Sequence, residues 1–111
     1  QEAILAPVLA VMRAAWFAPA LQFATGAAYA RTGGLYSRSP RHIEQAHQAF
    51  DVGNLYINRS ITGALVGRQP FGGHRLSGVG AKAGGEEYVK QFLVARVVSE
   101  QTLRRGFVPT L

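Results

Sequence analysis

Apolar residues recur along the chain with two spacings, which predict alternating strands and helices. Residues 7–13 form a short apolar run with β-branched members, and this predicts a strand. Four apolar residues at helical spacing then predict an amphipathic helix over residues 18–28. Gly33 and Gly34 are expected to end this segment, and residues 35–37 to form a short strand.

A second helix and a third strand follow. Ser39 and Pro40 predict a helix start, because serine can cap a helix and proline suits its first position. The apolar face of this helix extends to Phe50, residues 51–53 end it, and residues 55–58 predict a strand. The order strand, helix, strand, helix, strand indicates an α/β fold with parallel strands.

The composition changes between residues 63 and 85, where eight of the 13 glycines lie. A loop this long and rich in glycine is unusual in a compact domain unless it lines a site. Beyond it, residues 86–93 predict a closing helix, and the alternation over residues 94–100 predicts a half-exposed strand.

Composition narrows the classes of function. At 111 residues, with 48% hydrophobic and 16% charged residues, the chain is expected to be one globular domain at most. The net charge of +6 suggests nucleic acid, but the basic residues are dispersed and only Arg104 and Arg105 are adjacent. That pattern indicates a solvated surface, so we expect no nucleic-acid partner.

The sequence also bears on localisation. No apolar stretch approaches the roughly 20 residues that span a bilayer. The first residues show no basic and apolar regions of a signal peptide, so we expect a cytoplasmic protein. A start without Met suggests a processed chain or a piece of a longer one, and a targeting segment upstream is left open.

Common catalytic and metal-binding patterns are missing. Cysteine is absent, which removes thiol nucleophiles and thiolate metal sites, and the three histidines show no ligand spacing. No serine has an identifiable base, so we assign no catalytic residue. Residues 78–83 fit the pattern G-x-G-x-x-A, but no strand precedes them as a dinucleotide site requires.

The glycine-rich loop itself offers binding chemistry. Gly63 and Ala64 can present adjacent N–H groups to an anion, with each hydrogen bond to a charged group worth about 1.5–3 kcal/mol. Phe71, between Pro70 and Gly72, can offer a held aromatic surface to an apolar chain. A glycine-rich turn with a core phenylalanine would have the same pattern, because glycine indicates a conformational need and not a purpose.

Two sets of short motifs stand out along the chain. The first set is Pro70-Phe71-Gly72-Gly73 with Leu76-Ser77-Gly78. The second set is Gly53-Asn54-Leu55-Tyr56-Ile57-Asn58-Arg59, Thr62-Gly63-Ala64, Gln69, Lys82-Ala83-Gly84-Gly85, Thr32-Gly33-Gly34-Leu35-Tyr36-Ser37-Arg38 and the ending Glu100-Gln101-Thr102-Leu103-Arg104-Arg105-Gly106-Phe107. The first set resembles the pattern of the aldehyde dehydrogenase superfamily. The second set resembles the narrower pattern of its Δ1-pyrroline-5-carboxylate dehydrogenases, also called L-glutamate γ-semialdehyde dehydrogenases.

The resemblance implies a function. Such enzymes oxidise glutamate γ-semialdehyde to glutamate with NAD in proline catabolism, through a cysteine thiolate, hydride transfer and thioester hydrolysis. It implies that the backbone of Gly63 and Ala64 anchors the substrate's α-carboxylate and that Phe71 packs against its aliphatic stem. It further implies that the strand after residue 94 serves oligomerisation.

The resemblance also implies which parts are missing. We expect residues 1–93 to be the C-terminal part of the catalytic domain, with a substrate-anchoring loop at residues 59–85, and residues 94–111 to be the oligomerisation strand and tail. The cofactor domain, thiol and general base would lie outside the chain, which is expected to be inactive alone. Ala3 and Leu5 replace the family's Glu and Phe at the cofactor contacts. An alternative is a non-catalytic assembly or regulatory domain derived from the same family.

Overall fold

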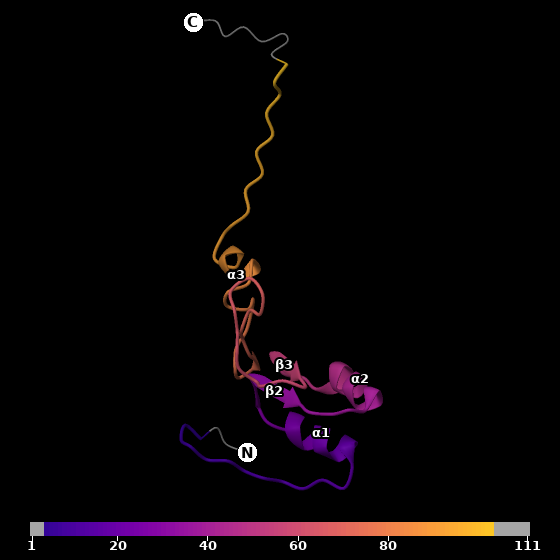
Figure 1. Cartoon of the computed structure of the whole chain (residues 1–111). Helices are drawn as coiled ribbons and strands as arrows, with labels where there is room; N and C mark the ends of the chain where they lie inside the picture. The colour runs from indigo at the N-terminus through magenta and orange to yellow at the C-terminus, as the bar shows by residue number, and fades with distance from the viewer. Residues whose placement is uncertain (1–3, 104–111) are drawn as a thin grey trace, which may run out of the picture.

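The computed structural model describes residues 4–103 of the chain and contains a β–α–β unit (Figure 1). Strands β2 (Thr32–Leu35) and β3 (Asn54–Ile57) are parallel, with Thr32 opposite Asn54 and Leu35 opposite Ile57. Helix α2 (Pro40–Ala49) connects them. The predicted mixture of helices with a parallel strand pair is therefore confirmed.

Helix α2 begins as its sequence predicts. The Ser39 hydroxyl accepts a hydrogen bond from the His42 amide (3.4 Å), and Pro40 occupies the first turn. Helix α1 (Phe17–Thr25) lies beside it, with the Phe17 ring stacked on His42 at 4.3 Å between centroids. The predicted helix over 18–28 thus ends earlier, at Thr25.

The strand predicted over residues 35–37 begins earlier, at Thr32, and ends at Leu35, so it contains the two glycines that were expected to end the first helical segment. A Cβ at Gly33 would lie 2.6 Å from Phe50 Cζ, and one at Gly34 would lie 2.6 Å from Ile61 Cγ2. Successive strand residues face opposite sides of a sheet. The two glycines therefore admit one apolar side chain on each face of β2.

Two predicted strands do not form. Residues 7–13 and 94–100 have no strand partner within residues 4–103, and the second segment runs away from the body as an extended arm (Figure 1). A strand needs a neighbour to satisfy its backbone hydrogen bonds, and these apolar runs have none here. The closing helix α3 (Glu87–Lys90) is also shorter than the predicted 86–93.

A short antiparallel strand pair joins the segment after α1 to the glycine-rich loop. Strand β1 (Tyr29–Ala30) pairs with β4 (His74–Arg75), with Tyr29 opposite Arg75 and Ala30 opposite His74. The pair thereby holds part of the glycine-rich loop, residues 59–85, against the residues that follow α1. Two-residue strands carry no periodic pattern, so the sequence did not predict this pair.

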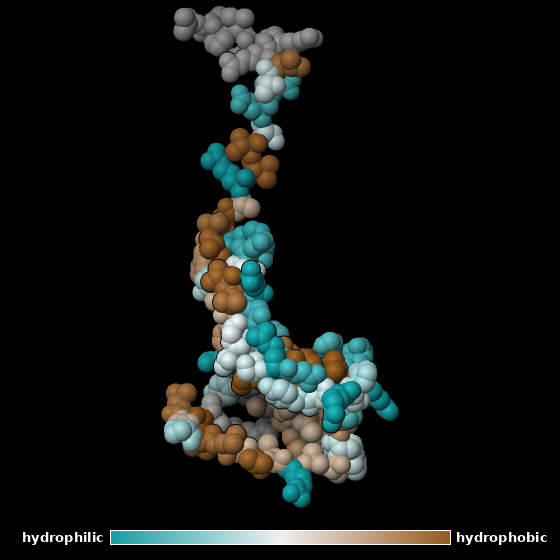
Figure 2. Space-filling model, in the orientation of Figure 1, coloured by the Kyte–Doolittle hydropathy of each residue, from teal (hydrophilic) through white to brown (hydrophobic). Residues whose placement is uncertain are grey.

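The apolar core is small. Among residues 4–103 only Ala30, Ala46 and Tyr56 are buried hydrophobic side chains, at 3%, 0% and 6% exposure. The radius of gyration is 23.2 Å, whereas a compact chain of this length has about 13 Å. Apolar surface gathers on the N-terminal segment and the C-terminal arm (Figure 2), where Val94 and Val97 are 96% and 90% exposed. Surface of this kind is characteristic of a segment that packs against other protein.

Candidate functional site

The Asn54 side chain holds the glycine-rich loop on both sides of Phe71. Its Nδ2 donates to the Pro70 carbonyl at 2.9 Å, and its Oδ1 accepts from the Gly72 amide at 3.0 Å. Asn54 is the first residue of β3, so these bonds tie the loop to the parallel sheet. Phe71 lies between the two tied residues and is half-buried. Its backbone is therefore held in place while part of its ring stays accessible.

Glycines let the loop backbone lie directly against the start of β3. A Cβ at Gly53 would lie 2.0 Å from the Gly72 oxygen and 2.6 Å from Gly73 Cα. A Cβ at Gly73 would lie 2.4 Å from the Ser77 Cβ. The Ser77 hydroxyl in turn accepts from the Ala30 amide at 3.1 Å. The glycines of this part of the loop are thus required by close packing of backbone on backbone.

A third segment of the loop braces Phe71 from the other side. Phe71 and Ala83 exchange two backbone hydrogen bonds, each of 2.9 Å. The Lys82 ammonium donates to the Gly72 carbonyl at 2.7 Å. The sequence 70–73 is therefore fixed between β3 and residues 82–83.

Gly63 and Ala64 lie on the exposed rim of the same loop, just before a tight turn closed by Leu65 and Gln69 (3.0 and 2.8 Å). Gly63 has a φ of +99°, which glycine tolerates and other residues rarely adopt. Within residues 4–103, neither the Gly63 nor the Ala64 N–H donates a hydrogen bond. Two adjacent amide donors are thus without a partner among the described residues.

An exposed ion-pair cluster joins the loop to the helices. The Arg75 guanidinium donates to Asp51 Oδ2 through Nε (3.0 Å) and Nη2 (2.6 Å), and through Nη1 to the carbonyls of Thr25 (2.7 Å) and Ala27 (2.8 Å). His74 Nδ1 lies 3.2 Å from Asp51 Oδ1. Arg75 therefore connects the end of α1, the residues after α2 and the returning loop.

This cluster predicts an acid-sensitive contribution to stability. The hydrogen bond from Arg75, followed by that from His74, lowers the pKa of Asp51 below its usual value. Because the folded pKa is the lower one, the pairing stabilises the fold above the usual value of about 3.9. The contribution is lost as the pH falls through the folded pKa. We expect Asp51→Asn to remove this part of the acid sensitivity in urea unfolding between pH 5 and 2, and an unchanged pH profile would contradict the pairing.

Neither a metal site nor a cofactor site is found in the part of the chain that the structure describes. No group of three His, Cys, Asp or Glu residues there could hold a metal ion. Residues 78–83 follow the two-residue β4 and precede the four-residue α3, so they lack the βαβ frame of a dinucleotide site. Leu5 is fully exposed, and Ala3 lies outside the described residues. The described residues therefore do not fit an NAD site on their own.

Three cavities lie against α1 and at the carboxyl ends of β2 and β3, and none of the three is lined by Gly63, Ala64 or Phe71. Over residues 4–103 no helix has both the length and the apolar character needed to cross a bilayer. The open rim of the glycine-rich loop stays the candidate for binding.

Sequence reasoning assigned no role to several residues that build this loop. Asn54 could have been noticed, because asparagine is depleted in strands and its presence there indicates a task for the side chain. Lys82 and the pair of Asp51 with Arg75 gave no such signal. Their partners lie 10 to 50 residues away in sequence, and only folding brings them together.

Comparison with known protein families identifies the family of the chain. The profile of the aldehyde dehydrogenase family matches residues 1–98. The chain therefore belongs to the aldehyde dehydrogenase family.

Relatives within that family include 1-pyrroline-5-carboxylate dehydrogenases. The chain is 48% identical over 100 residues to 1-pyrroline-5-carboxylate dehydrogenase 1 of Halalkalibacterium halodurans, covering 90% of this chain and 19% of that protein. The match to 1-pyrroline-5-carboxylate dehydrogenase of Bacillus subtilis is 46% identical with the same coverage.

Similar solved structures include a 1-pyrroline-5-carboxylate dehydrogenase and a proline utilization A protein. The 1-pyrroline-5-carboxylate dehydrogenase from Thermus with bound NAD superposes with a TM-score of 0.79 at 55% identity, over 83% of this chain and 18% of that one. Proline utilization A from Bdellovibrio bacteriovorus gives 0.88 at 50% identity, over 98% of this chain and 11% of that one. The chain thus spans about a fifth of the curated relatives that it matches (19%).

Proposed function

We propose that the chain is the C-terminal, substrate-anchoring part of an NAD-dependent dehydrogenase that oxidises L-glutamate γ-semialdehyde to glutamate in proline catabolism. The observation that carries the proposal is the pair of adjacent Gly63 and Ala64 amides that donate no hydrogen bond within residues 4–103, in the same loop as the braced Phe71. Identities of 45–48% to 1-pyrroline-5-carboxylate dehydrogenases support the choice of substrate.

The two parts of the loop suit the two ends of this substrate. The α-carboxylate takes hydrogen bonds from the Gly63 and Ala64 amides, and bonds to a charged acceptor are stronger than neutral ones. The accessible part of the Phe71 ring packs against the aliphatic stem. Together they hold the aldehyde at a set distance from the anchored carboxylate, which presents it to reacting groups that other residues supply.

The remaining chemistry belongs to residues beyond this segment. The sequence has no cysteine to act as the nucleophile, and NAD would be held by residues that the described segment does not contain. Residues 1–93 then complete the catalytic domain, and residues 94–111 supply an assembly strand. The exposed Val94 and Val97 support this, since an alternating apolar segment gains a partner by pairing with another chain or domain. A homo-oligomer is the expected assembly.

The proposal is tested on the longer polypeptide that carries this segment and on residues 1–111 alone. With NAD and glutamate γ-semialdehyde, the longer polypeptide is expected to produce NADH, and residues 1–111 to give no turnover. Residues 1–111 are also expected to self-associate, because their apolar faces stay uncovered. Sedimentation and absorbance at the NADH band measure both effects. Turnover by residues 1–111 alone would contradict the division of roles.

The mass of the polypeptide in its native source separates this proposal from the alternative. A denatured mass several times 11.9 kDa supports the dehydrogenase segment. A mass near 11.9 kDa would instead favour the non-catalytic assembly or regulatory domain, because no thiol or cofactor domain would then be present in the same chain.

A further inference from the structure

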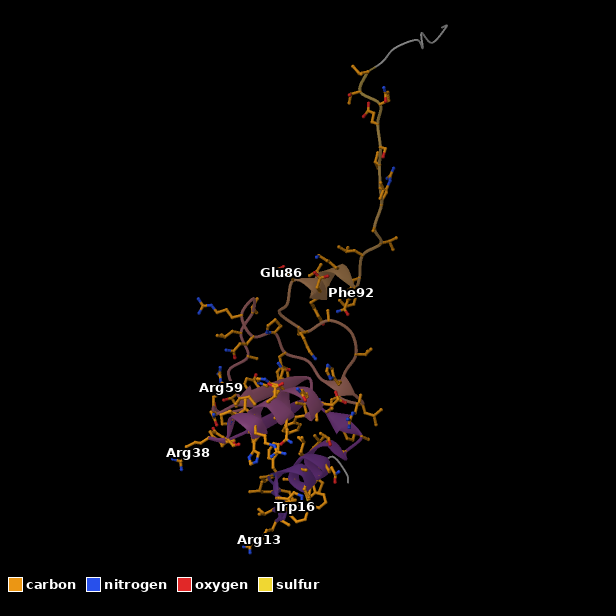
Figure 3. All side chains as sticks on the ribbon, turned by 90° about the vertical axis from the view of Figure 1, so that its right-hand side faces the viewer. Arg13, Trp16, Arg38, Arg59, Glu86 and Phe92 are labelled. Atoms are coloured by element: carbon orange, nitrogen blue, oxygen red, sulfur yellow. The ribbon has the colours of Figure 1, made fainter. Side chains whose placement is uncertain are left out.

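Arg59, at the start of the glycine-rich loop, is held over a buried ring. Its guanidinium lies 5.3 Å from the centroid of the Tyr56 ring, close enough for a cation–π contact. Tyr56 is only 6% exposed and belongs to β3, so the surface under Arg59 is part of the sheet. Figure 3 shows Arg59 at the base of the loop, which extends from there towards α3.

From this position Arg59 reaches the carbonyl groups next to the proposed anchor. Its Nη2 donates to the Thr62 carbonyl at 3.4 Å. With the Gln69 amide oriented to suit its neighbours, Arg59 Nη1 donates to Gln69 Oε1 at 3.0 Å, and Gln69 Nε2 donates to the Gly63 carbonyl at 3.0 Å. Two consecutive carbonyls, of Thr62 and Gly63, are thus both occupied by side-chain donors.

Because a peptide bond is planar, these contacts at the carbonyls also fix the direction of the N–H groups of Gly63 and Ala64. In a trans peptide the C=O and the following N–H point in opposite directions, and the described chain has no cis peptide. Holding the Thr62 oxygen therefore aims the Gly63 N–H away from Arg59. Holding the Gly63 oxygen likewise aims the Ala64 N–H away from Gln69. Hydrogen bonding at a carbonyl also polarises its peptide, which makes the N–H a better donor.

The glycine at the centre is consistent with this arrangement. A Cβ at Gly63 would lie 3.1 Å from Arg59 Nη2, and the backbone there has a φ of +99°. A larger residue would displace the guanidinium and strain the backbone together. The absence of a side chain at Gly63 lets Arg59 approach.

We infer that Arg59 and Gln69 are positioning residues that aim the Gly63 and Ala64 amides at the substrate carboxylate. The inference rests on the proposed function and adds to it the source of the anchor's orientation. Tyr56 is the platform that limits the movement of Arg59. The two side chains touch the backbone and not the substrate, so their effect is confined to substrates that carry the carboxylate.

Gln69→Glu tests the inference in the longer polypeptide that carries this segment. The glutamate still accepts from Arg59 but cannot donate to the Gly63 carbonyl. We expect kcat/KM for glutamate γ-semialdehyde to fall about 10- to 100-fold, mostly through a higher KM, because a charge-assisted anchor is lost. For 4-aminobutanal, which has the same aldehyde chain and amino group without the carboxylate, we expect a change in kcat/KM within about twofold. Arg59→Ala should reproduce this pattern, and Arg59→Lys should restore part of the loss.

Arg68→Ala is the matched control, because it removes one positive charge from the same loop. The Arg68 side chain is exposed and makes no hydrogen bond or ion pair with residues 4–103. For both aldehydes kcat/KM should change by no more than about twofold. The control therefore separates the orientation of the amides from the loss of a positive charge near the substrate. Equal losses on both aldehydes in Gln69→Glu, or a carboxylate-specific loss in Arg68→Ala, would overturn the inference. If the enzyme without substitutions showed no preference for the substrate that carries the carboxylate, the proposed function would be wrong, and the inference would be wrong with it.

Discussion

Replacing Gly53 by alanine is expected to lower the free energy of unfolding by about 3 kcal/mol or more. The added methyl group would lie 2.0 Å from the Gly72 oxygen and 2.6 Å from Gly73 Cα. Both are backbone atoms, so no rotation of a side chain can relieve the overlap. The loop must move away from β3, which also stretches the hydrogen bonds that Asn54 makes to it. Urea unfolding of the variant and the parent polypeptide measures the effect.

Gly26→Ala provides the comparison for this variant. Gly26 follows α1 with φ −73° and ψ −1°, a conformation that alanine adopts readily, and it is exposed. We expect its stability to change little or to rise by up to about 1 kcal/mol, since alanine restricts the unfolded chain. If Gly53→Ala were as mild as Gly26→Ala, the close approach of the loop to β3 would be wrong.

Asn54→Leu is expected to have the second large effect, on both stability and activity. The substitution keeps the branching at Cγ, with a somewhat larger side chain, but leaves the Pro70 carbonyl and the Gly72 amide without their partner. Each unpartnered group costs about 1–3 kcal/mol, so the two together are expected to cost about 2–6 kcal/mol. Phe71 lies between the two groups, and its displacement should reduce kcat/KM for the semialdehyde by about 10-fold or more. Unfolding and steady-state kinetics measure the two losses.

Asn54→Asp divides the effect between the two hydrogen bonds. The carboxylate can still accept from the Gly72 amide but cannot donate to the Pro70 carbonyl. Its losses of stability and of kcat/KM, relative to the parent, should therefore be smaller than those of Asn54→Leu. Identical losses for the two variants would mean that Gly72 gains nothing from residue 54.

Local signals in the sequence predicted the elements that local interactions build. Ser39 and Pro40 start α2 as expected, because a cap and a fixed φ act within one helical turn. The apolar residues of β3 and the glycine content of residues 63–85 likewise predicted a strand and a long loop. The family resemblance pointed to Gly63, Ala64 and Phe71, and their roles towards substrate stay predictions.

Predictions failed where the outcome depends on a distant partner. Residues 7–13 and 94–100 have the pattern of strands but no neighbour within residues 4–103 to pair with. The opposite error occurred at Gly33 and Gly34, which were expected to end the first helical segment and not to lie in a strand. They form part of β2, because Phe50 and Ile61 need the space that a side chain would occupy.

The sequence by itself determined the family, the α/β class, the start of α2 and the existence of an anion-binding candidate in the glycine-rich loop. These follow from residue types and from spacings of a few positions. Only the tertiary structure decided how the loop is held: by Asn54 from β3, by Arg75 with Asp51, and by Arg59 with Gln69. Hydrogen bonds between side chains and distant backbone groups produce no regular spacing of residues in a sequence. Their partners can therefore be identified only in the folded structure.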